Sequence, residues 1–413
     1  MTRKIPRFEL SLSKDDFNTI IHSTMDDGLT KANAYDCFET QFANYIGVKH
    51  AVIVPSARMG LYSILKNMEL DNRDEIILPS LTYHAVPSML LFLGFKPVFA
   101  DVNQRTYTIE AATIEEKITE NTKAIIPTHL YGLPCDMGAI SHLASRYNLK
   151  IIEDCAQACG AIYYGKRVGS LGDAGIYSFG LTKNITSFGG GVITTNDQLL
   201  ADCVRKEVDA YRLVGNFDLL KRLLLALVVK VLTNFYVFEW TLFPLICLST
   251  TFGTDFIHNL FREKERLFDK IPLKHRTRMS NIQANITLGQ LKRLDILNAK
   301  RRENAEFLIN NLGNNKGIRT PLVPEGVQSV FTGFVIQADE RDRLAVQLLR
   351  KGIDTSKGYV RACSSLPTFE NFAARCPNAE KLDKHMLHLP IYPALSRKDL
   401  CYISDCIKGS LKY

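Results

Sequence analysis

Lys183 is the residue that most directly suggests chemistry in this chain of 413 residues. It lies in the run SFGLTKNITSFGGG, and Asp154 and Gln157 lie upstream in IIEDCAQACGAIYYG. A lysine amine can form a Schiff base with an aldehyde, and a carboxylate can hold a pyridinium nitrogen protonated. The order of these residues therefore predicts a pyridoxal phosphate cofactor bound covalently to Lys183.

Each of these residues, taken alone, also has a simpler structural interpretation. Asp154 ends an apolar strand and would by default cap the next helix, and Gln157 would lie on a helix surface. Lys183 alone would be a solvated surface charge. Its neighbourhood favours the catalytic interpretation, because the glycines at 189–191 allow positive φ and close backbone approach. Partial desolvation in such a turn would lower the lysine pKa and favour the free amine.

Two segments are suited to bind the phosphate group of such a cofactor. Ser178 follows the apolar run AGIYSF and precedes Lys183 by five residues, so its hydroxyl can hydrogen-bond a phosphate oxygen. Ser56-Ala57-Arg58 follows the strand AVIVP and opens a helix, whose first backbone N–H groups form an anion site. Arg58 would add a charge-assisted bond, while Ser56 alone would also serve as an ordinary helix cap.

Three ring side chains follow the ends of expected strands. Tyr83, in PSLTYHAV, is placed to stack on a planar ring, although an isolated aromatic is more often part of a core. His84 and His129 are candidate proton carriers. For each histidine, a hydrogen-bonded structural role is the better interpretation.

The composition, 46% hydrophobic and 23% charged, is that of a globular protein, and the length suits two domains. The net charge of +8 suits phosphorylated substrates or an anionic membrane surface. No basic repeat interleaved with aromatics indicates nucleic acid. The ten cysteines lack zinc-site spacing, so we expect no metal site and free thiols. Because the start, MTRKIPRFELSLSKDD, has no apolar signal region, we expect a cytoplasmic protein.

Apolar runs alternate with amphipathic segments through the first half of the chain. The expected strands lie at 50–56, 74–80, 96–102, 123–129 and 149–155, with expected helices such as 57–70 and 137–148 between them. This alternation predicts an α/β fold with a mostly parallel sheet covered on both faces and with chemistry at the carboxyl ends of the strands. Residues 279–312 then form a long amphipathic helix, continuous or with one break, and a small α+β domain follows.

We expect a large domain over residues 1–260, with an apolar insertion at about 217–255, and a small C-terminal domain over 261–413. The insertion centres on Leu219–Leu248, which is long enough to span a membrane. Lys230 and Glu239 would be costly in hydrocarbon, and Pro244 should kink or end a helix.

An interfacial helix or a re-entrant helical hairpin therefore fits the insertion better than a spanning helix. Its basic flanks agree with membrane contact: Lys221 and Arg222 before it, then Arg262, Lys264 and Arg266 after it. An oligomer-interface hairpin and a lid over the active site are the alternatives.

Longer motifs link these residues in one order. The chain contains FETQFANYIGVKHAVIV, then HLYG, then EDxAQxxGAxYxGKxVGSxGDxGxxSF, then TKN with a GG turn. RMSNIQANITLGQLKRLD and LPIYPALSRKDL follow. Over almost its whole length the chain resembles the DegT-type (DegT/StrS) nucleotide-sugar aminotransferases, pyridoxal-phosphate enzymes of the aspartate-aminotransferase fold (fold type I).

The resemblance implies a role for each matching residue. Lys183 would be the Schiff-base lysine and proton shuttle, and Asp154 would pair with the pyridine nitrogen. The remaining cofactor contacts would be Gln157 near the ring oxygen, Tyr83 stacked on the ring, and Ser178 with the Ala57–Arg58 backbone at the phosphate.

The resemblance also implies a reaction and an assembly. An amino donor, usually glutamate, would load the cofactor with an amino group, and a keto-sugar would then receive it. Such sugars serve surface polysaccharide, lipopolysaccharide or secondary-metabolite synthesis. Family members are typically homodimers with active sites at the subunit interface.

The chain departs from the family pattern at three positions. The phosphate loop is usually Ser/Asn-Gly-Thr, and Ala57-Arg58 loses the threonine hydroxyl contact. Gly189 stands where an acidic residue commonly precedes the GG turn. Arg276 or Thr277 stands where an asparagine usually reaches the phosphate of the neighbouring subunit. The run at 219–248 is also longer and more apolar than the usual connection.

Three alternatives to a nucleotide-sugar aminotransferase follow. The same chemistry could act on a lipid-linked sugar or another amphiphilic ketone, with the enzyme peripheral on the inner membrane face through 219–248. The chain could be a sugar dehydratase using pyridoxamine phosphate, but such enzymes usually carry histidine in place of the lysine, so Lys183 favours transamination. It could be a silent scaffold, against which the intact set of Lys183, Asp154 and Gln157 argues.

Overall fold

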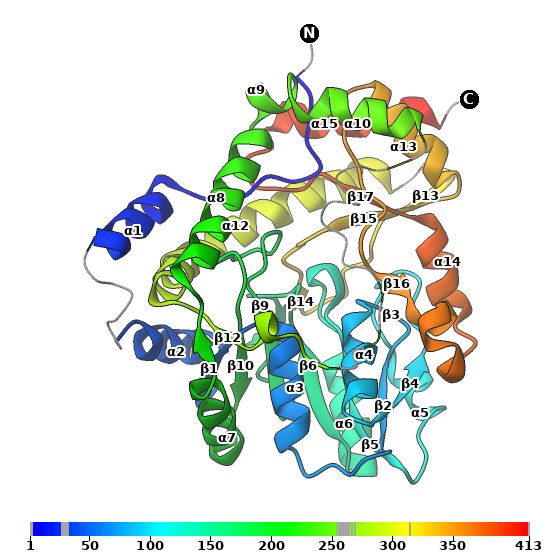
Figure 1. Ribbon diagram of the computed structural model, residues 1–413. Helices are drawn as coiled ribbons and strands as arrows, with labels where there is room; N and C mark the ends of the chain where they lie inside the picture. Colours follow the sequence, from blue (N-terminus) through cyan, green and yellow to red (C-terminus); the bar gives the residue numbers. More distant parts are fainter. Residues whose placement is uncertain are drawn as a thin grey trace.

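The centre of the fold is a seven-stranded sheet (Figure 1). The computed structural model describes residues 3–25, 33–252, 254, 265, 267, 270–313 and 315–411. In order across the sheet, the strands are β1 (His50–Val54), β10 (Gly191–Thr195), β9 (Ala174–Ser178), β6 (Lys150–Asp154), β5 (Thr122–Ile125), β2 (Glu75–Pro79) and β4 (Lys96–Ala100). Within this sheet β10 runs antiparallel to both of its neighbours, and the other six strands share one direction.

The five strands expected from apolar runs are therefore confirmed as β1, β2, β4, β5 and β6. Because six strands point the same way, their carboxyl ends meet at one edge of the sheet. The prediction of a mostly parallel sheet is confirmed, and the antiparallel β10 was not expected.

Helices cover both faces of this sheet, as the strand–helix alternation predicts. Alternate side chains of a strand point to opposite faces, so Val52 and Ile193 join one core and Ile53 and Val192 join another. The first face is covered by α3 (Ala57–Asn67), α4 (Ala85–Phe92) and α7 (Gln198–Asp209). The second face is covered by α2 (Asn33–Ile46), α5 (Ala111–Glu115) and α6 (Met137–Tyr147).

The C-terminal part has its own core around an antiparallel three-stranded sheet. The strands are β13 (Ile318–Arg319), β15 (Phe334–Ala338) and β17 (Met386–Leu389), and the helices are α13 (Arg341–Arg350), α14 (Pro377–His385) and α15 (Arg397–Ser410). Ile5 packs into this core and bridges Ile353, so the N-terminal segment belongs with it. Shorter elements are α1 (Lys14–Met25), β3 (Leu81–Thr82), β7 (Ile162–Tyr163), β8 (Lys166–Arg167), β11 (Arg212–Leu213), β12 (Thr277–Arg278), β14 (Val327–Gln328) and β16 (Arg361–Ala362).

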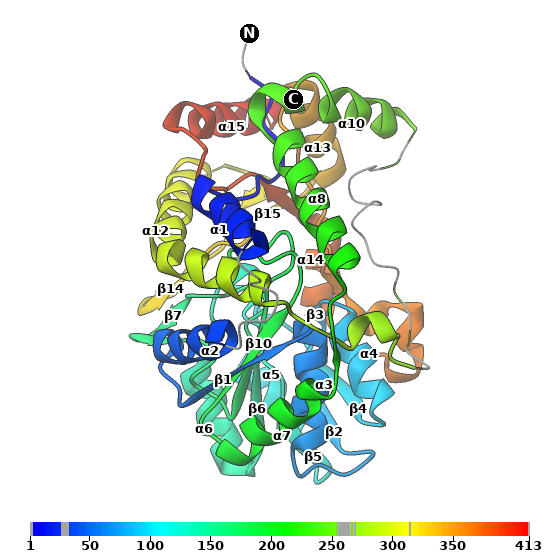
Figure 2. The same cartoon turned by 60° about the vertical axis from the view of Figure 1, so that its left-hand side comes forward.

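Helix α12 (Asn281–Leu312) joins the two parts as one continuous helix of 32 residues. It begins at a capping box, in which the Ser280 side chain accepts from the Gln283 N–H and the Gln283 side chain accepts from the Ser280 N–H. The break that the sequence allowed is not present. Figures 1 and 2 show α12 running from the level of α1 and α2 toward the C-terminal sheet.

The apolar insertion folds into three helices, α8 (Asn216–Leu232), α9 (Phe235–Phe238) and α10 (Leu242–Thr251). In Figures 1 and 2, α8 rises from the seven-stranded sheet toward α10, α13 and α15. The expectation that Pro244 kinks or ends a helix is wrong, because Pro244 is the third residue of α10. The first N–H groups of a helix have no intrahelical partner, so proline is tolerated there.

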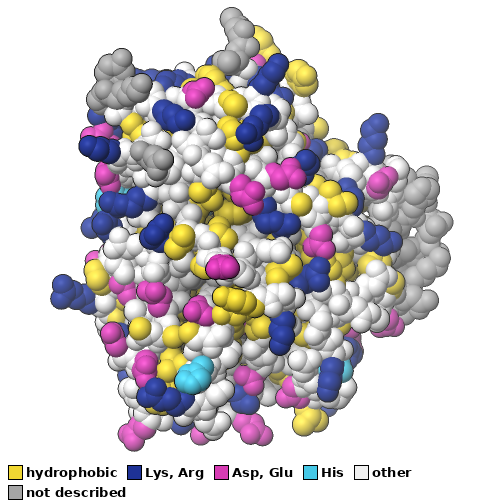
Figure 3. All heavy atoms as spheres, turned by 180° about the vertical axis from the view of Figure 1, so that it is seen from behind, with side chains coloured by type: hydrophobic (Ala, Val, Ile, Leu, Met, Phe, Trp, Pro, Cys, Tyr) yellow, Lys and Arg dark blue, Asp and Glu magenta, His cyan; other side chains and the backbone are white. Residues whose placement is uncertain are grey.

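Helix α8 is buried on one side only. Leu219, Ala226 and Val229 pack against Leu10 and Phe188. Exposed hydrophobic side chains follow the rest of the segment: Phe217, Leu220, Leu224, Leu225, Leu227, Val228, Val231, Tyr236, Trp240, Leu245, Leu248 and Phe252. We call these residues the outer face of α8–α10. On the side of the molecule seen in Figure 3, hydrophobic side chains form small groups among charged ones.

None of the helices in the described ranges is long and apolar enough to cross a membrane. Of the expected basic flanks, Lys221 and Arg222 lie on α8. Arg262, Lys264 and Arg266 lie outside the described residues.

Candidate active site

A cavity of about 600 Å³ opens at the carboxyl edge of the seven-stranded sheet. All seven residues proposed from the sequence line it: Ala57, Arg58, Tyr83, Asp154, Gln157, Ser178 and Lys183. They come from segments as far apart as α3 and the turn after β9. The structure therefore brings the predicted site residues together.

Asp154 and Lys183 form an oppositely charged pair in this cavity. Asp154 is the last residue of β6 and is only 5% exposed. Burial raises the pKa of the Asp154 carboxyl, and this rise is opposed by the N–H of Ala156, 3.1 Å from Oδ1, and by the Lys183 charge. Burial lowers the pKa of the Lys183 amine, opposed by the Asp154 charge. The amine is thus more easily deprotonated than an ordinary lysine, as a nucleophile requires.

The turn after Lys183 is held by two glutamines of α12. The backbone N–H of Thr186 donates to Oε1 of Gln290 at 2.8 Å, and Nε2 of Gln290 donates to the Thr186 carbonyl at 2.8 Å. Seven residues earlier, Nε2 of Gln283 donates to the Ser187 carbonyl at 2.8 Å. A spacing of seven residues places both amides on one face of the helix, so α12 fixes the backbone of the turn.

Asn298 of α12 extends the same contact to the residue next to the lysine. Its Oδ1 accepts from Nδ2 of Asn184 at 2.9 Å, and its Nδ2 donates to the Cys159 carbonyl at 3.0 Å. Both asparagines are buried. Side chains of α12 thus hold the segment that directly follows Lys183. We call residues 183–188 the lysine turn.

The N-terminus of α3 lies directly against β10. A Cβ added at Gly191 would lie 2.8 Å from the backbone nitrogen of Ala57, so this approach requires glycine. Ser56 caps the helix by accepting from the Met59 N–H at 3.2 Å. The N-terminus of α3 thus lies at the cavity, although Ala57-Arg58 departs from the family's usual loop.

The backbone at position 189 explains why a glycine stands where the family commonly has an acidic residue. Its φ is +131°, and a Cβ there would lie 2.9 Å from Nη1 of Arg222 on α8. A glycine is therefore suited to this position, where the inserted helix brings an arginine against the turn.

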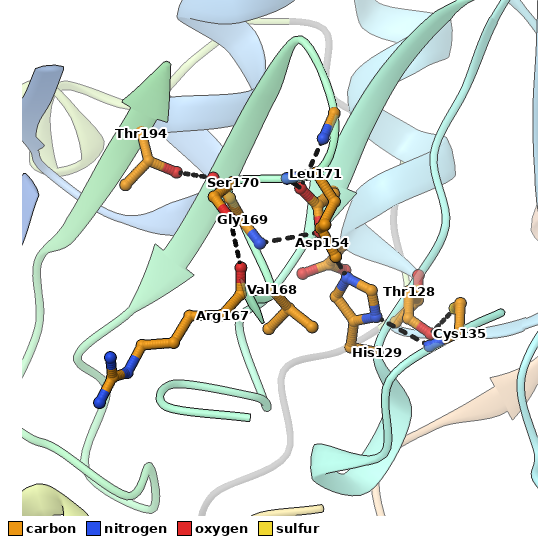
Figure 4. Close-up of polar contacts among 12 residues, drawn as sticks. Thr128, His129, Cys135, Asp154, Arg167, Val168, Gly169, Ser170, Leu171 and Thr194 are labelled. Atoms are coloured by element: carbon orange, nitrogen blue, oxygen red, sulfur yellow. Dashed lines mark hydrogen bonds and ion pairs between the residues drawn. The ribbon is translucent and has the colours of Figure 1, made fainter. Parts of the chain in front are cut away.

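His129 is structural, as the sequence suggested (Figure 4). Its Nδ1 accepts from the Cys135 N–H at 3.0 Å, so Nε2 carries the proton and donates to Oε2 of Glu153 at 3.0 Å. The Glu153 carboxylate is fully buried and accepts three backbone N–H groups at 2.7–2.8 Å, from Gly169, Leu171 and Gly172. This network braces the loop after β8 against β6.

Within the described ranges, one group of side chains has metal-site geometry: His129, Glu153 and Cys155, whose ligand atoms lie within 4.8 Å of one another. The histidine and carboxylate atoms already have protein partners. The hydrogen-bond network thus explains the cluster without an ion. All ten cysteines are free thiols, which confirms that expectation.

Several residues that line the cavity were not proposed as site residues from the sequence. They come from the N-terminal segment, from the turns that contain Tyr131 and Asn184, from α12 and from the C-terminal part, and include Arg7, Glu9, Tyr131, Asn184, Gln290, Arg301, Thr332, His388 and Tyr392. Arg301 lies in the run AKRREN, which is typical of a solvated helix face. Only the tertiary fold shows that it faces the cavity.

Comparison with known proteins agrees with this geometry. The sequence model of the DegT/DnrJ/EryC1/StrS aminotransferase family matches residues 11–218 and 254–408. The chain belongs to this family. Its DegT-type fold is also shared by S. venezuelae DesV, with a TM-score of 0.77, 27% identity and coverage of 100% of both chains. The prediction of fold type I is confirmed.

Two relatives of this chain have names that describe amino-sugar enzymes. One is dTDP-3-amino-3,6-dideoxy-alpha-D-galactopyranose transaminase of Aneurinibacillus thermoaerophilus, 33% identical over 90% of this chain and 88% of the relative. The other is GDP-perosamine synthase of Escherichia coli O157:H7, 30% identical over 98% of this chain and 97% of the relative. The DegT-type chain is therefore an aminotransferase.

The family match leaves residues 219–253 uncovered. This gap coincides with most of α8 and all of α9 and α10. Most of the segment expected as an insertion at 217–255 therefore lies outside the family match.

Proposed function

We propose that this DegT-type enzyme transfers an amino group from an amino-acid donor, glutamate, to a keto-sugar carried on a nucleotide, with pyridoxal phosphate bound at Lys183. The observation that carries the proposal is the pair of Lys183 and Asp154 in one cavity, with the lysine pKa lowered by burial. The names of the two relatives support the substrate class. The products would serve polysaccharide or secondary-metabolite synthesis.

The residues present fit this cofactor. The N-terminus of α3 lies at the cavity with Ser178 and Arg58, where a phosphate would bind, and the buried Asp154 carboxylate suits a ring N–H. Tyr83 and Gln157 would contact the ring and its oxygen. When bound, pyridoxal phosphate supplies an aldehyde carbon and a ring that accepts electrons.

The roles of the chain's own groups follow from their positions. Lys183 Nζ would hold the cofactor and would move a proton at the α-carbon of the donor. Asp154 would stabilise positive charge on the ring nitrogen. The amides of Gln283, Gln290 and Asn298 keep the lysine turn in place during both steps. The lysine also favours transamination over sugar dehydration.

The cofactor assignment is tested by the absorbance of the purified protein. We expect a visible band of lysine-bound pyridoxal phosphate that L-glutamate bleaches, and no such band in Lys183→Ala. Incubating the bleached enzyme with a panel of nucleotide-linked and lipid-linked keto-sugars should restore the band with its substrate. A colourless wild-type protein that cannot be reconstituted would overturn the proposal.

We further infer a homodimer and a peripheral membrane contact through the outer face of α8–α10. Support for the membrane contact is the row of exposed leucines and valines, with Tyr236 and Trp240 more than 80% exposed beside it. The row lies almost wholly in the part that the family match leaves uncovered. Lys221 on the same helix would face anionic headgroups.

Flotation with anionic liposomes tests this contact, and the oligomeric state is measured beside it by light scattering. We expect wild type to float and the double variant Leu224→Ser/Leu248→Ser to remain in solution with an unchanged dimer. Loss of the dimer in that variant, with no flotation of wild type, would reassign the face to the subunit interface. Nucleotide-linked sugars remain the proposed substrates, and activity only on a lipid-linked sugar would replace them.

A further inference from the structure

Arg301 is a buried cation without a counter-ion in the described part of the chain. It lies on α12, is 6% exposed and lines the cavity that contains Lys183. Its guanidinium donates to Oδ1 of Asn298 and to Oγ of Ser11, each at 3.4 Å. Both acceptors are neutral, and both distances are at the long end for a hydrogen bond. Burial is the cause that lowers its pKa to about 10.

A second arginine that lines the same cavity, Arg7, is paired with a carboxylate and serves as a comparison for Arg301. Nε and Nη2 of Arg7 donate to the two carboxylate oxygens of Asp354, each at 2.8 Å, and both side chains are buried. The nearby carboxylate of Glu9, which also lines the cavity, accepts from Nζ of Lys230 at 2.7 Å. Asp354 and Glu9 are therefore already paired with other cations, and among the described residues no acid neutralises Arg301.

A buried guanidinium without an anion is unfavourable, because its charge has lost water and gained little in return. The arrangement becomes favourable when a ligand brings an anion. Since Arg301 lines the cavity, the ligand of that cavity is the natural source of the anion.

The position of Arg301 relative to the lysine turn indicates which of the two substrates, the amino-acid donor or the nucleotide-linked sugar, brings the anion. The Oδ1 of Asn298 that accepts from Arg301 also accepts from Asn184, the residue after Lys183. A substrate whose amine is exchanged at Lys183 therefore has a cation available within the same pocket. Every amino-acid donor carries a carboxylate beside its amine, so a cation joined to the lysine turn through Asn298 suits that carboxylate.

We propose that Arg301 binds a carboxylate of the amino-acid donor. The planar guanidinium would donate two parallel hydrogen bonds to the two carboxylate oxygens, as Arg7 does to Asp354. This inference rests on the proposed transamination and names the substrate class that the residue selects. Arg301 would thereby hold the donor amine toward Lys183 and discriminate against amines that lack a carboxylate.

The test measures binding to the holoenzyme without turnover. The probe is 2-methyl-L-glutamate, which has both carboxylates but no α-hydrogen to lose, and its affinity is determined by calorimetry. The variants are Arg301→Gln and Arg301→Lys, with Arg302→Gln as the matched control one residue along α12, outside the cavity lining. The same titrations are repeated with UDP, GDP and dTDP, which carry phosphates and no carboxylate.

We expect Arg301→Gln to weaken binding of 2-methyl-L-glutamate by about 10- to 100-fold, the effect of losing a charge-assisted hydrogen bond. Arg301→Lys should lose less, because the charge remains and only the fork geometry is lost. Arg302→Gln should bind like wild type. Affinity for the nucleoside diphosphates should stay within about twofold in all three variants.

Three outcomes would overturn the inference. Unchanged binding of 2-methyl-L-glutamate in both Arg301 variants would show that the carboxylate binds elsewhere. Weakened binding of the nucleoside diphosphates alone would assign Arg301 to the sugar carrier. Loss of the cofactor absorbance in a folded Arg301→Gln variant would assign it to the cofactor phosphate. Absence of that absorbance in wild type would instead contradict the proposed function, so the two failures are distinguishable.

Discussion

The lysine turn and the inserted helix α8 are in contact, but the turn is held by polar contacts within the chain, whereas α8 exposes apolar side chains. Phe188 of the turn packs against Leu219 of α8, so the two share one core. In the turn, backbone and side-chain polar groups meet amides of α12 that lie about a hundred residues away in sequence. On α8, by contrast, seven hydrophobic side chains between Phe217 and Val231 are exposed.

The two regions differ in whether the same chain supplies the contacts that cover them. The backbone of the lysine turn is held by side chains of the same chain, beside a cavity that would admit small molecules. No described residue covers the outer face of α8–α10. We therefore propose that a membrane surface covers it. The four predictions below separate these two behaviours.

The largest effect is expected at Lys183. Lys183→Ala should lower the transamination rate by about 10³-fold or more, because the covalent attachment and the proton carrier are both lost. Flotation on liposomes should not change, since the outer face of α8–α10 is untouched. A variant that keeps substantial turnover would show that the lysine turn is not the reacting centre.

Glu153→Gln should destabilise the frame of the site without touching the cavity. The change weakens the acceptor of three backbone N–H groups and of His129, so the free energy of unfolding should fall by about 3 kcal/mol in urea denaturation. Glu116→Gln, at an exposed position, serves as control and should change it by less than about 0.5 kcal/mol. Equal stability of the two variants would remove the bracing role of Glu153.

Two adjacent leucines of α8 should respond in opposite ways. Leu219 is 3% exposed, so Leu219→Ala should cost about 2–3 kcal/mol of unfolding free energy and leave flotation unchanged. Leu220 is 61% exposed, so Leu220→Ala should cost less than about 0.5 kcal/mol and weaken flotation. If both substitutions affect only stability, the outer face has no membrane role.

The smallest expected change is a shift of a pH profile. Capture of pyridoxal phosphate by the apoprotein requires the free amine, so its rate should rise with pH around a midpoint below 10.5, the value of an ordinary lysine. The Asp154 charge favours the protonated amine and raises the Lys183 pKa, so Asp154→Asn should move the midpoint lower still. Asp202→Asn, on the surface of α7, should leave it in place, and an upward shift in Asp154→Asn would contradict the pairing.

Much of this architecture could be predicted because it depends on local pattern. Apolar runs ending in polar residues identified five strands and placed Asp154 at a carboxyl end. Strand β10 was not identified because GVITT begins with glycine and runs antiparallel, a direction that no local pattern records.

The parts of the site that were missed depend on long-range contacts. Arg301 and Gln290 look like ordinary polar positions of an amphipathic helix, and only the packing of α12 against the lysine turn gives them a function. His129 was correctly predicted to be structural, but its partner Glu153 was not identified, because adjacent acids in a strand look equivalent in sequence. Alternation sends Asp154 to the cavity and Glu153 to the loop after β8.

Helix α12 has a mechanical consequence. It is about 48 Å long at 1.5 Å per residue, with its first half bonded to the lysine turn and Leu308 and Leu312 embedded in the C-terminal core. Such a rod acts as a lever between the two. A rotation of the C-terminal part by a few degrees about the middle of the rod would displace Gln283, Gln290 and the turn together, so that the reach of the Lys183 amine would be set by the angle between the two parts of the fold.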